Sequence, residues 1–241
     1  MYTKRALNQL FSRLGELVER DQALDHHFAL HTLFEMMDVA SRADMKSDVL
    51  KDLDKQKQVL NGYRGNPAIS EAALDKIVNQ LDQCFTDLNA LAGKSGQSLT
   101  ENDWLMSIRS RVGIPGGTCE FDLPSYYAWQ HESVAKRQAD IQQWASSLAP
   151  LYKALEVMLG LLRDAGHPHM VAAPGGQFQQ SPKEGRQYQL LRLRIDPALG
   201  LIPEISGNRL MISIRLMRQD MDARLKLASD IDAGFELTLC A

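Results

Sequence analysis

The chain has 241 residues, 27 Lys and Arg against 30 Asp and Glu, and a formal net charge of −3. That length suits one large domain or two small ones, and a hydrophobic content of 44% is ordinary for a globular protein. No run approaches the roughly 18 consecutive apolar residues of a membrane span, and the first residues lack the hydrophobic region of a signal peptide. The three scattered cysteines favour reduced thiols, so we expect a cytoplasmic protein.

Apolar residues recur at helical spacing through the first half of the chain. One stripe comprises Leu7, Leu10, Phe11, Leu14 and Leu17. A second helix is expected from about residue 21 to 39, and further helices should begin at N-caps formed by Asp44, Ser70 and Thr100. The last of these should end near residue 112. A final helical stretch, residues 132–163, should break or restart at Pro150, which has no N–H for a helix interior.

After residue 166 the period changes from helical to alternating. Residues 187–195, 201–205, 208–217 and 235–239 read as strands, and residues 206–208 are expected to form a tight turn. The predicted fold class is therefore α+β, with an N-terminal helical domain followed by a small antiparallel β-sheet domain. We assign residues 1–115 and 131–165 to the helical domain, and residues 116–130 and 166–241 to the β domain.

The sequence contains little that indicates catalysis. Nucleotide-binding loops, HExxH and GxSxG are absent, and Gly116-Gly117 follows a helix instead of preceding one, which favours a turn over a phosphate site. His27 and His31 have ligand spacing on a helix, but no third ligand lies nearby in the sequence. We therefore expect no enzyme activity, no cofactor and no metal site.

Basic residues gather in the predicted sheet. Between residues 186 and 226 there are eight basic and four acidic residues, a local net charge of +4 in an acidic chain. Most of the bases are arginines, which suit bidentate capture of carboxylates or phosphates. An exposed sheet face that charge protects from edge pairing would show the same composition. The bases are Arg186, Arg192, Arg194, Arg209, Arg215, Arg218, Arg224 and Lys226.

One segment is specific to a family. Residues 114–129, IPGGTCEFDLPSYYAW, resemble the IPGGxCxFDLPxxxxW pattern of the ZapD cell division proteins. Residues 34–42 and 44–56 resemble the second and third helices of that family. Residues 190–193, 203–207 and 212–217 resemble its sheet. The similar segments follow one another in the same order from about residue 7 to residue 240.

The resemblance implies a cytoplasmic, non-enzymatic homodimer that binds the C-terminal tail of FtsZ and bundles FtsZ protofilaments at mid-cell. Two departures concern the binding surface. The chain lacks the basic helix start typical of the family, for which Lys4 and Arg5 are possible substitutes, and it has Asp103 where some members have a base. Tyr127 stands where some members have His and could support binding. The basic sites of the family fall on Arg42, Lys46, Arg109, Arg111, Arg192, Arg209 and Arg215.

A nucleic-acid-binding module that uses the same arginines is the alternative. Binding of single strands would favour aromatic residues among the bases, and this stretch offers only Tyr188. The acidic net charge also counts against nucleic acid. The sequence therefore favours a protein partner and predicts neither nucleic acid nor a membrane as a target.

Overall fold

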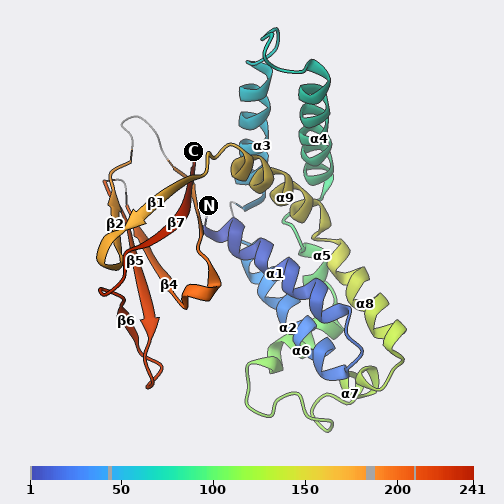
Figure 1. Cartoon of the computed structure of the whole chain (residues 1–241). Coiled ribbons are helices and arrows are strands. Elements are labelled where there is room, and N and C mark those ends of the chain that lie inside the picture. Colours follow the sequence, from blue (N-terminus) through green and yellow to red (C-terminus); the bar gives the residue numbers. More distant parts are fainter. Residues whose placement is uncertain (1, 43–44, 183–187, 209) are drawn as a thin grey trace. The chain divides into compact units, whose positions relative to one another are not determined.

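The computed structural model describes residues 2–42, 45–182, 188–208 and 210–241 (Figure 1). Two compact units divide the chain, Tyr2–Leu159 and Gly160–Ala241, so that the boundary falls within helix α9 (Ala149–Asp164). Helices make up the first unit, and antiparallel sheets dominate the second. The predicted α+β fold, with helices before strands, is confirmed.

The helices of the first unit follow the predicted apolar stripes closely. Leu7 and Leu14 of the first helix and Leu30 and Leu33 of the second are buried where these two helices pack together. Pro150 lies in the first turn of a restarted helix, as expected, and the chain bends by 70° at this break. The helices are α1 (Tyr2–Val18), α2 (Ala23–Ala40), α3 (Met45–Asn61), α4 (Glu71–Ala90), α5 (Gln97–Thr100), α6 (Asp103–Val112), α7 (Pro124–Gln130), α8 (Val134–Ser146) and α9.

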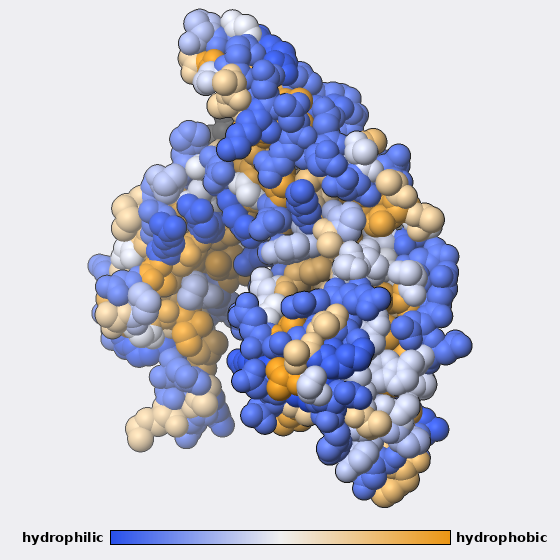
Figure 2. Space-filling view, turned by 90° about the vertical axis from the view of Figure 1, so that its right-hand side faces the viewer, coloured by the Kyte–Doolittle hydropathy of each residue, from blue (hydrophilic) through white to orange (hydrophobic). Residues whose placement is uncertain are grey.

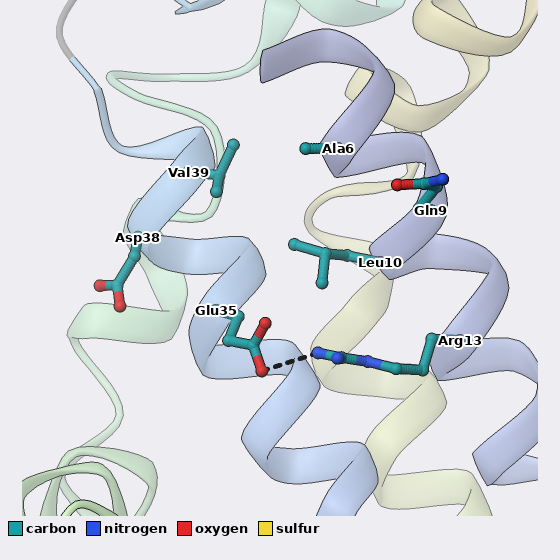
Figure 3. Close-up of a pocket in the computed structure, with 7 residues that line it drawn as sticks. All are labelled: Ala6, Gln9, Leu10, Arg13, Glu35, Asp38 and Val39. Atoms are coloured by element: carbon teal, nitrogen blue, oxygen red, sulfur yellow. Dashed lines mark ion pairs between the residues drawn. The ribbon is translucent and has the colours of Figure 1, made fainter. Parts of the chain in front are cut away.

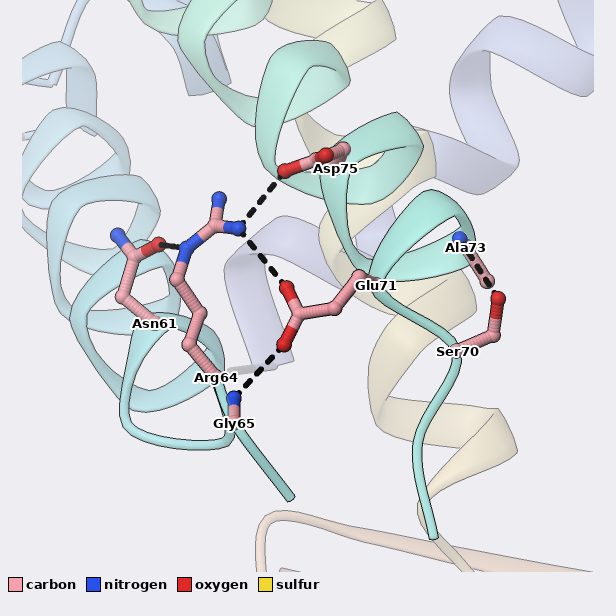
Figure 4. Close-up of polar contacts among 7 residues, drawn as sticks. All are labelled: Asn61, Arg64, Gly65, Ser70, Glu71, Ala73 and Asp75. Carbon is pink, nitrogen blue, oxygen red and sulfur yellow. Dashed lines mark hydrogen bonds and ion pairs between the residues drawn. The ribbon is translucent and has the colours of Figure 1, made fainter. Parts of the chain in front are cut away.

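Helices α3 and α4 form a hairpin whose loop is held by polar contacts (Figure 4). Arg64 pairs with Glu71 and Asp75, while Glu71 also accepts a hydrogen bond from the Gly65 amide. Ser70 caps α4 by accepting from the Ala73 amide, which confirms the predicted cap. The hairpin, at the top of Figure 2, has a largely hydrophilic surface on the face shown there. These contacts hold the loop in place, so its polar residues need no binding function to explain them.

The start of α6 differs from the prediction. Thr100 was expected to cap it, but Thr100 belongs to the short helix α5, where its hydroxyl donates to the Gln97 carbonyl at 2.6 Å. Asn102 is the cap instead, and its side chain accepts from the Leu105 amide at 3.0 Å. Any Asn, Asp, Ser or Thr can serve as an N-cap, so composition alone does not choose between neighbours. The other expected cap, Asp44, lies outside the described residues.

Residues 116–130, which include most of the family-like segment and which we assigned to the β domain, lie within the unit Tyr2–Leu159. Tyr126 and Trp129 on α7 are buried, and their rings pack with Trp104 and Trp144 of α6 and α8. Burial raises the pKa of the Tyr126 hydroxyl, which lies 2.6 Å from His27 Nδ1. This aromatic cluster ties the segment to the helices, a contact that hydrophobic periodicity cannot reveal.

The two glycines of this segment form the expected turn after α6. Gly116 has a φ of +73°, a conformation that residues with a Cβ rarely adopt. A Cβ on Gly117 would come within 2.6 Å of the Arg111 carbonyl oxygen. Both positions therefore require glycine for backbone geometry, which accounts for the pair without a phosphate ligand.

A buried arginine joins α8 to the start of α2. Arg137 is only 5% exposed, and its Nε donates to His26 Nδ1 at 2.9 Å. Its two terminal nitrogens donate to the carbonyls of Asp21, Gln130 and Glu132. One guanidinium thus satisfies three backbone carbonyls from two separate stretches of chain.

The second unit is built from two antiparallel sheets. One has the order β1-β7-β3, and the other has the order β2-β5-β4, with β6 also pairing β5. Phe235 and Leu237 from the first sheet and Ile212, Ile214 and Leu216 from the second share one buried core. The strands are β1 (His169–Ala173), β2 (Gln177–Gln180), β3 (Leu190–Arg194), β4 (Ile202–Gly207), β5 (Ile212–Gln219), β6 (Leu225–Leu227) and β7 (Ala233–Cys240).

The turn between β4 and β5 lies later than predicted. Gly207 still belongs to β4, and the Asn208 amide donates to the Met211 carbonyl at 2.9 Å. The side chain of Asn208 accepts from the amides of Leu210 and Met211, so that the contacts of the turn begin at Asn208. The alternation predicted for residues 208–217 is confirmed along β5, where Ile212, Ile214 and Leu216 face the core.

In the part of the chain that the structure describes, no single helix is both long and apolar enough to cross a membrane. The bent pair α8–α9 passes that test only when its two helices are counted together.

Candidate functional site

The C-terminal end of α2 brings predicted basic residues together. Arg109, in the last turn of α6, reaches Asp38 near the end of α2, and its guanidinium donates to the Asp38 carboxylate. Arg42 follows the C-cap residue Ser41, and the Arg42 carbonyl accepts from the Met45 amide at 3.1 Å. Cations are favoured here because the last carbonyls of a helix carry partial negative charge.

Lys46 connects this end of α2 to the loop after α4. The residue stands in the first turn of α3, and its Nζ donates to the carbonyls of Leu91 and Gly93. The next residue in that loop, Lys94, lines a cavity of about 380 Å³ together with Ser41 and Arg109. We call Arg42, Lys46, Lys94 and Arg109 the α2-end cluster. The sequence prediction missed Lys94, although the glycines on either side of Lys94-Ser95 mark a tight loop.

The loop of this cavity is rigidly shaped. Gly93 and Gly96 have φ values of +63° and +76°, and a Cβ on Gly96 would come within 2.8 Å of the buried Leu148 side chain. The side chain of Gln97 folds back and accepts from the Lys94 amide at 3.3 Å. Only glycine fits both the left-handed backbone and the contact with Leu148. The residues between the two glycines are therefore held in one position.

Two further predicted residues lie on neighbouring helices. Arg111 is exposed near the end of α6, but residues two apart on a helix do not share a face, so it points away from Arg109. Tyr127 on α7 is exposed, and its ring contacts that of His131 at a centroid distance of 4.3 Å. Of the binding residues predicted in the helical unit, three belong to the α2-end cluster, and Arg111 and Tyr127 lie outside it.

In the β unit, the predicted arginines lie on different sheets. Arg192 of β3 stands opposite Thr238 of β7. The Nε of Arg192 and the hydroxyl of Thr238 are buried and have no hydrogen-bond partner among the described residues. Burial raises the pKa of the nearby Cys240 thiol, and the charges of Arg192 and Arg163 oppose that shift. Arg192 is therefore partly a packed residue, and its substitution would disturb the sheet.

Arg215, in contrast to Arg192, is exposed. Its side chain is 48% exposed on the outer face of β5, and it pairs with Glu204 of β4 at 3.1 Å. Because the inner faces of the two sheets share a core, Arg192 and Arg215 lie on opposite outer faces. Arg192 and Arg215 therefore do not share a face, although the sequence placed both in the predicted sheet. Arg209, the remaining predicted site, lies outside the described residues.

The groove between α1 and α2 is a less suitable site for an acidic ligand (Figure 3). Its volume is about 440 Å³, and Arg13 of α1 crosses it to pair with Glu35 of α2 at 2.7 Å. Glu35 and Asp38 give its α2 wall negative charge. An incoming carboxylate would meet repulsion here, so the groove is not part of the candidate site.

His27 and His31 each contact another side chain. His31 is paired with Glu35 at 2.9 Å, and His27 contacts Tyr126. Burial and the neighbouring His31 lower the pKa of His27. Within the described residues, no three His, Cys, Asp or Glu side chains are arranged to hold a metal ion.

Comparison with known proteins agrees with this architecture. The signature of a family described as a cell division protein matches residues 6–215. That match, across both structural units, defines the chain as a cell division protein. The chain belongs to the ZapD family.

Three relatives carry the description "Cell division protein ZapD", and each is 50% identical to the chain over 235 residues. The relative from Janthinobacterium sp. (strain Marseille) aligns with 98% of this chain and 93% of its own length. Those from Ralstonia pickettii (strain 12J) and Ralstonia nicotianae (strain ATCC BAA-1114 / GMI1000) each align with 97% of this chain and 92% of their own length.

Proposed function

We propose that this chain binds the C-terminal tail of FtsZ and cross-links FtsZ protofilaments into bundles, which promotes assembly of the Z-ring at the division septum. It would act in the cytoplasm at mid-cell, as a binding protein without catalysis or cofactor. Membership of a family of cell division proteins supports a role in division. The α2-end cluster supports the mode of binding, because two of its four basic residues, Lys94 and Arg109, line one cavity in a chain of net charge −3.

A disordered acidic tail presents carboxylates and few apolar anchors. Recognition of such a tail rests on charge-assisted hydrogen bonds from several basic side chains. Arg109 already demonstrates this chemistry, since its guanidinium holds the carboxylate of Asp38. The exposed Arg215 supplies a second basic position in the other unit.

A direct binding experiment tests whether the FtsZ tail is the partner. We expect a fluorescent FtsZ tail peptide to bind the full-length protein, and an unlabelled tail peptide to displace it. A single-stranded oligonucleotide of equal charge should not displace it at the same concentration. Salt would weaken both kinds of complex, so competition and not salt dependence separates them. Displacement by the oligonucleotide alone would favour the nucleic-acid alternative.

Bundling further requires two tail sites on one particle. A two-fold homodimer supplies them without a second kind of binding motif, and it gains from the high effective concentration of the second site. We therefore expect sedimentation at micromolar concentration to show a stable dimer. A monomer that still bundles FtsZ would contradict the dimer and would indicate two tail sites within one chain.

A further inference from the structure

A buried hydroxyl belongs to a residue that lines the cavity of the α2-end cluster. Ser95 lines this cavity and is only 2% exposed, and its Oγ has no hydrogen-bond partner among the described residues. A buried hydroxyl without a partner destabilises the folded protein, and native structures contain few of them. The glycines at 93 and 96 hold Ser95 in this position. The hydroxyl is therefore a buried donor in the wall of a cavity that Lys94 and Arg109 also line, and it has no partner among the described residues.

Asp38 already engages the arginine of the same cavity. The Asp38 carboxylate, which is 62% exposed, accepts from Nη2 of Arg109. In Figure 3 this side chain projects from α2 on the side away from α1. The other terminal nitrogen, Nη1, has only a weak contact with the Met106 sulfur at 3.9 Å. Half of the guanidinium fork thus holds a carboxylate of the protein, and the other half has no strong acceptor among the residues that the structure describes.

We propose that the cavity takes one carboxylate of the bound acidic peptide, with Ser95 as its buried hydrogen-bond donor and Arg109 as its charge partner, and that Asp38 competes with this carboxylate for Arg109. The inference rests on the proposed function and adds to it a specificity-determining residue and an internal competitor. Lys94 contributes charge at the cavity wall.

A carboxylate fits this cavity better than a phosphate. A phosphate brings more negative charge against Asp38 and against the partly negative carbonyl end of α2. A carboxylate carries a single charge, which Arg109 and Lys94 can neutralise even while Asp38 remains nearby. Its two oxygens allow one to accept from Arg109 and the other from the Ser95 hydroxyl.

Substitution of Ser95 separates binding from stability. We expect Ser95→Ala to weaken binding of the FtsZ tail peptide by about 10-fold, the typical effect of a hydrogen bond to a charged group. The same change should leave the thermal midpoint unchanged or raise it slightly, because it removes an unpaired buried hydroxyl. A purely structural serine would instead lower the midpoint. Ser110→Ala is the matched control, since that hydroxyl is exposed on α6 and bonded to the Ser107 carbonyl.

Substitution of Asp38 tests the competitor. We expect Asp38→Asn to tighten peptide binding by about 3-fold or more, because Arg109 is released from a charged partner. Inorganic phosphate at millimolar concentration should not displace the peptide, whereas a tail peptide with its carboxylates converted to amides should bind poorly. Displacement by phosphate would indicate a phosphate site and overturn the carboxylate assignment.

The outcomes of these experiments distinguish failure of the proposed function from failure of the roles assigned to Ser95 and Asp38. If the unchanged protein fails to bind the tail peptide, the proposed function is wrong. If it binds, and Ser95→Ala binds equally well, the role of Ser95 is wrong while the proposed function stands. If Asp38→Asn binds no tighter than the unchanged protein, Asp38 is not a competitor.

Discussion

Reversing the charge of Arg215 should weaken binding of the FtsZ tail by about 5- to 150-fold and abolish bundling. The change removes an attraction to the acidic tail and adds a repulsion, together on the order of 1–3 kcal/mol. Tail binding is measured with the fluorescent peptide, and bundling by sedimentation of FtsZ polymers. Bundling should fail even where binding is only weakened, because each cross-link needs two occupied sites.

The structure also predicts that Arg215→Glu folds normally. Arg215 and Glu204 form an exposed pair, and such pairs contribute at most about 1 kcal/mol to the free energy of unfolding. The thermal midpoint should therefore shift by less than about 4 °C. Arg192 would be a poorer test, since its Nε is buried in the sheet. The same reversal at Arg209, outside the described residues, should also weaken binding.

Lys76→Glu is the control for this experiment. Lys76 is exposed on α4, outside the matched basic set, and its reversal changes the net charge of the protein by the same amount. We expect it to affect neither tail binding nor bundling. Normal bundling by Arg215→Glu, or a loss explained by unfolding, would show that Arg215 is not a binding residue.

Local patterns in the sequence predicted most elements of the fold. The apolar stripe from Leu7 to Leu17 and the alternation from Ile212 to Leu216 depend only on spacing. Leu7 and Leu14 of the stripe are buried and its other members are partly buried, while Ile212, Ile214 and Leu216 all face the core. The errors arose where several residues offered similar local chemistry. Asn102 and Thr100 are both competent caps, and the side chain of Asn208 accepts from the amides of Leu210 and Met211, which lie beyond the predicted turn.

The candidate site was predictable only in part, because it depends on contacts between distant residues. Similarity to the family supplied Arg42, Lys46 and Arg109, but no spacing rule relates them to Lys94 and Ser95. The cavity forms because the loop after α4 meets the end of α2 and α6. Likewise, the sequence predicted that basic residues gather in one small sheet domain, whereas the strand order places Arg192 and Arg215 on different sheets of that unit.

The largest effect on stability is expected at Arg137. We predict that Arg137→Met lowers the free energy of unfolding by on the order of 3 kcal/mol or more, since each buried acceptor left without a donor costs about 1–3 kcal/mol. The acceptors that lose their donor are His26 Nδ1 and the carbonyls of Asp21, Gln130 and Glu132. For a chain of this size, the thermal midpoint should fall by about 6–12 °C.

Arg20→Met is the matched control, because it makes the same change of side chain at an exposed position. The Arg20 side chain is 59% exposed and pairs with Asp25 at 3.2 Å, so its loss should alter the free energy of unfolding by no more than about 0.5 kcal/mol. Arg137→Lys should fall between the two, since an ammonium has three donors and cannot reproduce the planar fork that reaches two stretches of chain. Equal midpoints for Arg137→Met and Arg20→Met would mean that water replaces the guanidinium at these carbonyls, and that Arg137 does not hold α8 against the start of α2.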